Sequence, residues 1–283
     1  MVDSKSEAVD AAQEADVPPL RDEMIALEEV YVVRDGRSLL HDVNWHVDAH
    51  GHWVILGPNG AGKTTMLQVA STYLGPTRGT VRVLGSTRGR VDVRDLRLRI
   101  GYAGAGPAAM VRGRLPALEV VVTGKHASFV DSRWHEYVDA DWERAGQLLA
   151  VLDAADLEQQ TYATLSAGQK QRVLIARSLM PDPEILLLDE AMTGLDLGAR
   201  ERLVGSMRRL AADPASPVVV LVTHHVEEIP PGFDHIAMMA AGTITAQGAI
   251  DEVLTADSLS ECYQQPLRLE NRDGRFRAWS PGA

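Results

Sequence analysis

A glycine-rich segment, Gly57 to Thr65, constrains this chain more than any other feature. It contains the pattern G-x-x-x-x-G-K-[ST], in which glycines let consecutive backbone N–H groups point at phosphate oxygens. The lysine of such a loop reaches the β- and γ-phosphates, and the hydroxyl that follows it holds Mg²⁺. The expected nucleotide-binding residues are therefore Gly57, Pro58, Asn59, Gly60, Ala61, Gly62, Lys63, Thr64 and Thr65.

The residues on either side of this loop favour the same interpretation. Trp53 to Leu56 is a strand-like apolar run, and a helical pattern extends from Lys63 to about Tyr73. Phosphates would therefore lie at a helix N-terminus, where the backbone N–H groups and the helix dipole favour an anion. A glycine-rich turn that matches by chance is the alternative, and the flanking elements make it the weaker one.

Composition narrows the class of protein. The 283 residues are 45 % hydrophobic with a net charge of −11, which argues against nucleic acid as a partner. A single cysteine, Cys262, excludes an intrachain disulfide and fits a reducing cytoplasm. No apolar run approaches the ~20 residues of a membrane span. We expect a cytoplasmic protein, with residues 1–23 as a disordered acidic tail rather than a signal peptide.

Periodicity predicts an alternating order of strands and helices. The continuous apolar runs Ile185 to Leu188 and Val218 to Val222 are typical of central parallel strands. Three hairpins are expected, turning at Asp35-Gly36, Ala241-Gly242 and Asp273-Gly274. Helical patterns occur between residues 116 and 152, between 199 and 211, and in short stretches up to about 263, followed by a C-terminal extension over 264–283.

Three further motifs carry polar residues at the ends of predicted elements. Ser166, Gly168 and Gln169 precede an amphipathic helix; alone, the serine could be an ordinary N-cap. Asp189 and Glu190 end the first apolar strand, where one carboxylate can bind Mg²⁺ and the other can take a proton from water. His224 ends the second such strand; alone, it would more often be a structural residue.

Taken in order, these motifs resemble the ATP-binding cassette (ABC) ATPases, over about residues 27–254. The resemblance implies that Lys63, Glu190 and His224 are catalytic and that Thr64 and Asp189 bind Mg²⁺. It also implies that Ser166, Gly168 and Gln169 form the signature sequence. Asp196, in Gly194-Leu195-Asp196, would then communicate between subunits.

The implied fold is an α/β P-loop NTPase of the ABC type, within residues 24–263. It has a mostly parallel sheet core, an antiparallel β lobe and a helical signature-motif lobe over about 104–180. The family's arrangement is a homodimer, or a heterodimer with a related ATPase, with two Mg-ATP molecules bound head to tail. Separate transmembrane permease subunits would place this cytoplasmic chain at the inner face of the membrane.

Three departures from the family pattern stand out. The family usually has a glutamine after an Ile-Gly-Tyr-like strand, but here Ile100-Gly101-Tyr102 is followed by Ala103-Gly104-Ala105 and no glutamine occurs from 100 to 146. Where the family often stacks an aromatic ring on adenine, this sequence has Arg34, whose guanidinium can also stack on a base. Ala191 follows Glu190 where proline is common.

Two other functions stay open at this point. The missing glutamine and the C-terminal extension favour a soluble ABC-type ATPase with a regulatory or nucleic-acid-related role, although the acidic composition gives no support to nucleic acid. A nucleotide sensor that barely hydrolyses is the other, and Glu190 and His224 argue against it. His46, His50 and His52 fit no familiar zinc spacing, so we expect surface histidines there rather than a metal site.

Overall fold

The computed structural model describes residues 23–129 and 132–282. All but one residue of the expected acidic tail therefore lies outside the described residues, and Glu23 belongs to the first strand. Strands β1 (Glu23–Arg34) and β2 (Arg37–Asp48) form the predicted N-terminal hairpin. Asp35 and Gly36 turn it with φ of 49° and 73°, as a tight hairpin requires.

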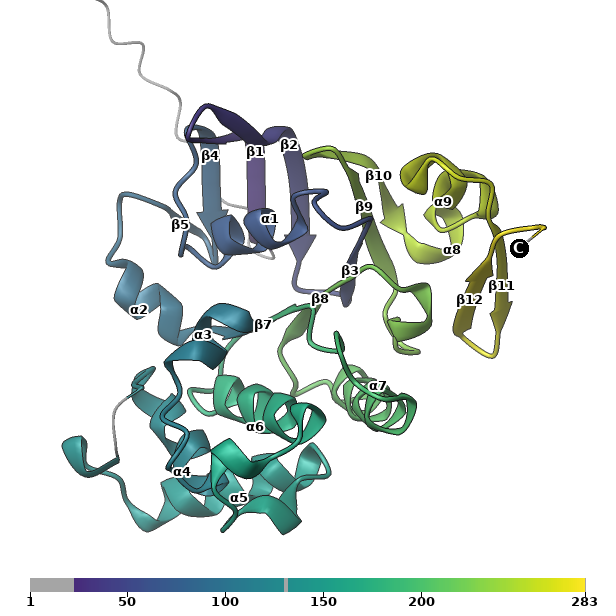
Figure 1. The fold of residues 1–283 in the computed structure, drawn as a ribbon. Coiled ribbons are helices and arrows are strands. Elements are labelled where there is room, and N and C mark those ends of the chain that lie inside the picture. Colours follow the sequence, from purple (N-terminus) through teal and green to yellow (C-terminus); the bar gives the residue numbers. More distant parts are fainter. Residues whose placement is uncertain (1–22, 130–131, 283) are drawn as a thin grey trace, which may run out of the picture.

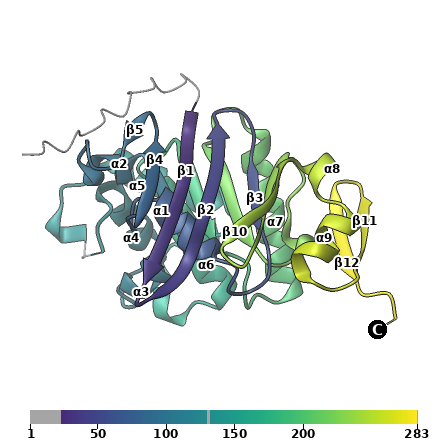
Figure 2. The ribbon, with the colours of Figure 1, turned by 90° about the horizontal axis from the view of Figure 1, so that it is seen from above.

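This hairpin is part of an antiparallel sheet. Together with β4 (Arg78–Val83) and β5 (Ser86–Thr87) it forms four strands in the order β2-β1-β4-β5 (Figure 2). Each neighbouring pair runs antiparallel. The predicted antiparallel β lobe is confirmed.

A second sheet forms the centre of the molecule. Its strands are β3 (Trp53–Leu56), β6 (Ile100–Ala103), β7 (Ile185–Asp189), β8 (Val218–Thr223), β9 (His235–Ala240) and β10 (Thr243–Ala249). Their order is β10-β9-β3-β8-β7-β6; five strands pair in parallel, and β10 closes the predicted hairpin antiparallel to β9.

Both faces of the central sheet are covered, which explains the continuous apolar runs. In β7, Leu186 and Leu188 pack into the core shared with the helices, whereas Ile185 and Leu187 pack into the core shared with the β lobe. Alternate residues of β8 divide in the same way. Strands buried on both sides need apolar side chains at every position.

The helical lobe lies below the central sheet in Figure 1. It contains α3 (Ala105–Met110), α4 (Ala117–Val122), α5 (Asp139–Val151) and α6 (Ala167–Leu179), with short 3₁₀ turns between them, including η1 (Thr123–His126) and η2 (Ser132–Trp134). The helical pattern predicted over 116–152 is interrupted after η1, because Ala127 adopts a left-handed conformation with φ of 48°. Sequence periodicity does not register such a break.

Three helices connect the strands of the core: α1 (Lys63–Ala70), α2 (Val93–Leu98) and α7 (Leu197–Ala212). Helix α1 ends before the predicted Tyr73, since Thr72 turns left-handed with φ of 64°. Helix α7 begins two residues before the predicted start, where Asp196 caps it by accepting the N–H of Ala199 at 2.7 Å.

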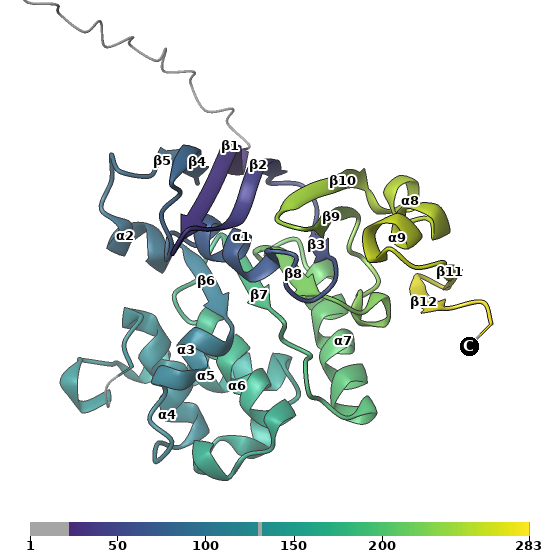
Figure 3. The same ribbon diagram turned by 45° about the horizontal axis from the view of Figure 1, so that its top comes forward.

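The C-terminal elements lie at the side of the molecule opposite the helical lobe (Figure 3). They are α8 (Ile250–Val253), α9 (Ala256–Tyr263), β11 (Arg268–Arg272) and β12 (Arg275–Trp279). The last two form the small hairpin predicted around Asp273-Gly274. Among the described residues, every helix is too short or too polar to cross a membrane.

Candidate functional site

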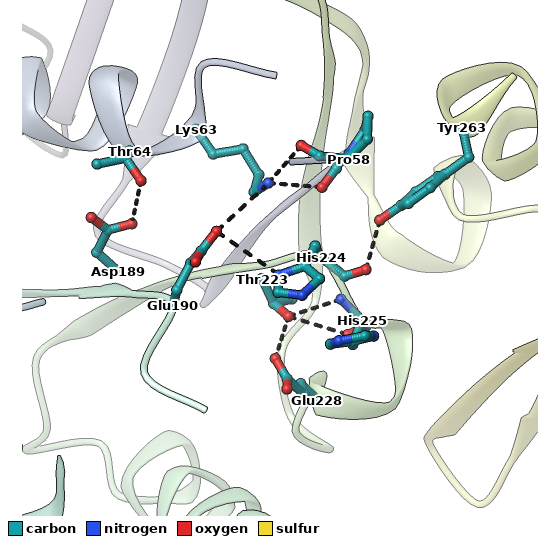
Figure 4. A network of polar contacts seen from close by, with 11 residues as sticks. Pro58, Lys63, Thr64, Asp189, Glu190, Thr223, His224, His225, Glu228 and Tyr263 are labelled. Atoms are coloured by element: carbon teal, nitrogen blue, oxygen red, sulfur yellow. Dashed lines mark hydrogen bonds and ion pairs between the residues drawn. The ribbon is translucent and has the colours of Figure 1, made fainter. Parts of the chain in front are cut away.

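The candidate site lies at one edge of the central sheet, where the carboxyl ends of β3, β7 and β8 meet. Parallel pairing places Leu56 beside Thr223, and Asp189 beside Val222. Because all three strands run the same way, the residues that follow them emerge at this common edge. The glycine-rich loop, Glu190 and His224 are thus brought together from distant parts of the chain (Figure 4).

Two glycines of the loop are required by its geometry. A Cβ atom on Gly57 would lie 2.1 Å from the carbonyl oxygen of Met239, so only glycine allows this approach to β9. Gly62 precedes α1 with φ of 99°, a conformation that is strained for other residues. The loop therefore leads directly into the N-terminus of α1, where the first N–H groups of a helix have no intrahelical partner.

Lys63 is buried at the start of α1. Its ammonium donates to the carbonyl oxygens of Gly57 and Pro58, both at 2.8 Å, and lies 4.0 Å from Glu190 Oε1. Burial lowers the pKa of Lys63, and Glu190 and Asp189 oppose that shift. The lysine is thus held by its own loop in a position from which it can transfer to phosphate oxygens.

Thr64 and Asp189 form the pair that sequence reasoning assigned to Mg²⁺. The Thr64 hydroxyl donates to Asp189 Oδ1 at 2.9 Å, and the Tyr102 hydroxyl donates to Oδ2 at 3.2 Å. Burial raises the pKa of Asp189, while these two hydrogen bonds lower it. A hydroxyl and a carboxylate are the hard oxygen ligands that Mg²⁺ prefers, so the donor set fits the ion.

Glu190 and His224 face each other beside the loop. Oε1 of Glu190 lies 3.9 Å from Nδ1 of His224, and no hydrogen-bond partner for this buried nitrogen occurs among the described residues. Burial, followed by the neighbouring His225, lowers the pKa of His224, which favours the neutral imidazole. Glu190 holds φ at 51°, a strained conformation of the kind that persists where a side chain must be aimed.

The cavity at this edge has a volume of about 380 Å³ and includes residues that sequence reasoning missed. Gly60 to Thr65 and Glu190 line it, and so do Ser38 and Leu39 of β2 and Ala241-Gly242 of the β9–β10 turn. The turn is attached by hydrogen bonds of 3.0 Å from Gly242 to Ala61 and from His41 to Gly242. Ala241-Gly242 was predicted as a turn, but only long-range pairing places it at the site.

The signature residues and Asp196 lie together at a second hollow. Ser166, Gly168, Gln169 and Asp196 all line it, and it shares no lining residue with the first cavity. Ser166 is also an N-cap, because its hydroxyl accepts the Gln169 N–H at 3.3 Å while Gln169 Oε1 accepts the Ser166 N–H at 2.8 Å. The capping interpretation is therefore correct.

Two of the departures from the family pattern, at Arg34 and near Ala105, can be placed in the structure. Arg34 does not line the cavity; its guanidinium donates to the carbonyl oxygen of Gly75 at 2.8 Å, so stacking on adenine stays a prediction. Ala105 is the first residue of α3. Near it, the Tyr102 hydroxyl rather than a glutamine reaches Asp189.

One of the three clustered histidines departs from expectation. His46 and His50 are exposed, but His52 is half-buried, and its Nδ1 accepts the N–H of Val219 at 3.0 Å. Burial lowers the pKa of His52. The expectation of a surface histidine is wrong for His52, because its ring nitrogen accepts a hydrogen bond from a backbone N–H near the start of β8.

The order of these motifs along one α/β core can be compared with known proteins. A family model described as "ABC transporter" matches residues 40–193, more than half of the chain. The chain belongs to the ABC transporter family. The match confirms that the motifs of this chain are those of the ABC ATPases. The chain, called the cassette from here on, is an ATP-binding protein of that family.

Curated relatives extend over nearly the whole cassette. The "Putative ABC transporter ATP-binding protein" of Streptococcus mutans is 37% identical over 252 residues, which cover 89% of this chain and 96% of the relative. The "Uncharacterized ABC transporter ATP-binding protein YlmA" of Bacillus subtilis is 38% identical over 255 residues, with the same coverage. The "Hemin import ATP-binding protein HmuV" of Burkholderia pseudomallei is 35% identical, covering 87% of this chain and 95% of the relative.

Solved structures agree on the fold. The dimeric MJ0796, described as a bacterial ABC transporter cassette, superposes with a TM-score of 0.70 at 25% identity, covering 80% of this chain and 99% of that one. The ADP conformation of the cassette MJ1267 gives a TM-score of 0.71 at 22% identity, covering 86% and 98%. The predicted fold class, an ABC-type P-loop NTPase with its two lobes, is confirmed.

Proposed function

We propose that two copies of this cassette bind two Mg-ATP molecules head to tail, hydrolyse them, and thereby drive a transporter whose membrane-spanning subunits are separate chains. The observation that carries this proposal is the convergence of four groups at one edge: Lys63, the Thr64–Asp189 pair, Glu190 and His224. Each of these groups would have a different role in phosphoryl transfer to water.

The chain's own residues account for the chemistry. Loop N–H groups and Lys63 would hold the phosphates, with the lysine moving from the Gly57 and Pro58 carbonyls to phosphate oxygens. Mg²⁺ held by Thr64 and Asp189 would neutralise charge on the β- and γ-phosphate oxygens. Glu190 would take a proton from water while the oxygen of that water bonds to the γ-phosphorus. The bond between the γ-phosphorus and the bridging oxygen of the β-phosphate would break, which releases ADP and phosphate. His224 would donate a hydrogen bond to the γ-phosphate.

The separation of the two hollows supports the dimer. Ser166 and Gly168 line a hollow that shares no residue with the loop cavity, so we propose that the signature of one copy meets the nucleotide of the other. The start of α6 offers N–H groups and positive dipole character to that phosphate. Relatives named as import and transporter ATP-binding proteins support a membrane partner.

Recovery from the native cell tests the transport role. We expect a tagged cassette, purified in detergent, to bring down at least one polytopic membrane protein in a stoichiometric amount, together with Mg-dependent ATP hydrolysis. Binding to the membrane partner should survive a high-salt wash that removes nonspecific attachment. Recovery from the soluble fraction alone, with hydrolysis but no such partner, would instead favour the regulatory ATPase.

Tyr102 offers a test of the magnesium pair. Tyr102→Phe removes one of two hydroxyl donors to Asp189, so the apparent affinity for Mg²⁺ in the presence of nucleotide should fall by about 10-fold, as for other outer-shell partners of metal ligands. Titration of Mn²⁺ followed by electron paramagnetic resonance measures this without hydrolysis. Tyr73→Phe is the matched control, because its ring packs against Tyr102 with centroids 5.4 Å apart. Equal metal affinity in the two variants would contradict the assignment.

A further inference from the structure

The C-terminal hairpin contacts two segments that lead directly to the site. Strand β12 lies against the 3₁₀ turn η5 (Val226–Glu228), which begins two residues after His224. It also reaches α7, whose first turn is capped by Asp196. Figure 1 shows β11 and β12 beside α9, at the end of the chain. The extension is therefore connected to both the histidine segment and the helix that follows Asp196.

Arg275 makes these connections with one guanidinium. Nη1 and Nη2 donate to the two carboxylate oxygens of Glu201 at 2.7 and 2.9 Å, a bidentate pair. Nη2 also donates to the carbonyl oxygen of Glu227 at 3.2 Å. Glu201 lies five residues after Asp196, and Glu227 three residues after His224. One side chain thus joins the start of α7 to the segment after the histidine.

Two more bonds hold the histidine segment. The backbone N–H of Ala278 donates to Glu227 Oε1 at 3.2 Å, so β12 binds both the main chain and the side chain of Glu227. From α9, the Tyr263 hydroxyl donates to the carbonyl oxygen of His224 itself at 2.9 Å (Figure 4). Helix α9 is in turn anchored to the core by Leu259 and by Cys262, whose thiol donates to Met239.

We propose that Tyr263 and the C-terminal hairpin form a positioning element, which fixes residues 224–228 relative to the start of α7 and thereby holds His224 in place for hydrolysis. This inference rests on the proposed function. It assigns Arg275 and Tyr263 as positioning residues: they contact the backbone around His224 and the helix after Asp196. Because a displacement of about 1 Å can cost a large factor in rate, such support acts on turnover rather than on nucleotide binding.

Arg275→Ala tests the element. We expect kcat for ATP hydrolysis to fall by about 10-fold, with KM and the Kd for Mg-ADP changed less than about 2-fold. Arg277→Ala is the matched control: it removes the same charge from the same strand, at a residue that is exposed, and should keep wild-type kcat. A purely stabilising hairpin would change the melting temperature without separating kcat from nucleotide affinity.

Conservative variants keep the test decisive if Arg275→Ala folds poorly. Arg275→Lys keeps the charge but cannot reproduce the fork-shaped contact with Glu201, so kcat should lie between those of wild type and Arg275→Ala. Tyr263→Phe removes only the hydroxyl that reaches His224, and should lower kcat by about 3-fold. The double variant Arg275→Ala with Glu201→Gln should be no slower than Arg275→Ala alone, because both substitutions remove the same Arg275–Glu201 interaction.

A second readout separates this inference from the proposed function. The ring signals of isotopically labelled histidine, with His224 assigned by its loss in His224→Ala, should shift in Arg275→Ala and Tyr263→Phe but not in Arg277→Ala. Absence of hydrolysis in the wild type would remove the proposed function, and the His224 signal would still decide whether the element positions this residue. Hydrolysis at wild-type kcat in Arg275→Ala and Tyr263→Phe, or an unmoved His224 signal, would overturn the inference.

Discussion

Glu190→Gln is expected to bind Mg-ATP and to lose hydrolysis by about 100- to 1,000-fold, within the range for removal of a general base. Glutamine keeps the size of the side chain and can still lie near Lys63 and His224, which are 4.0 and 3.9 Å from Glu190 Oε1 in the wild type. It cannot take a proton from water, however. The nucleotide should therefore remain a triphosphate, and binding should be unchanged or tighter.

The oligomeric state of this variant tests the assembly. If the signature of one copy binds the γ-phosphate held by the other, a triphosphate that is not hydrolysed should hold the two copies together. We expect Glu190→Gln to sediment as a dimer with Mg-ATP and as a monomer with Mg-ADP. Glu252→Gln, the same substitution at an exposed position of α8, should hydrolyse ATP at the wild-type rate. Near wild-type turnover in Glu190→Gln would contradict the role assigned to this residue.

The central elements could be predicted from the sequence because local pattern and tertiary environment agree there. The strands that lead to Gly57, Glu190 and His224 are apolar up to their last residue, which is Asp189 in β7 and Thr223 in β8, and the sheet buries them on both faces. Such runs have one compatible place in an α/β fold, so the positions of the motifs at one edge follow from the strand order. All three hairpin turns carry a glycine, which provides the positive φ that a tight turn needs.

The parts that could not be predicted depend on contacts between distant residues. Ser38 and Gly242 reach the loop cavity only because β2 and the β9–β10 turn pack beside it. Tyr102 and Tyr263 make their hydrogen bonds across the fold, to Asp189 and to the His224 backbone. Nothing in their local sequence distinguishes them from core tyrosines. The same is true of His52, whose acceptor role depends on the approach of β8.

Lys63→Ala is expected to weaken nucleotide binding rather than turnover alone. In the wild type the ammonium is buried, with 3% of the residue exposed, and two of its three N–H donors bond to the Gly57 and Pro58 carbonyls. In the proposed role ATP competes with these carbonyls for the ammonium, and a charged phosphate is the stronger acceptor. Removal of one charged hydrogen-bond donor costs about 1.5–3 kcal/mol, roughly 10- to 150-fold in Kd.

Calorimetry with Mg-ATP and Mg-ADP gives the most direct measurement of this loss. In the proposed role the lysine contacts both the β- and γ-phosphates, so Lys63→Ala should lose more affinity for the triphosphate than for the diphosphate. Lys125→Ala is the control: it removes a lysine whose partner, Asp141, lies in the helical lobe at 2.6 Å. Lys63→Met keeps most of the side-chain volume, so an equal loss in both Lys63 variants assigns the effect to the missing charge. Unchanged affinity for ATP in both would mean that the glycine-rich loop does not hold the phosphates.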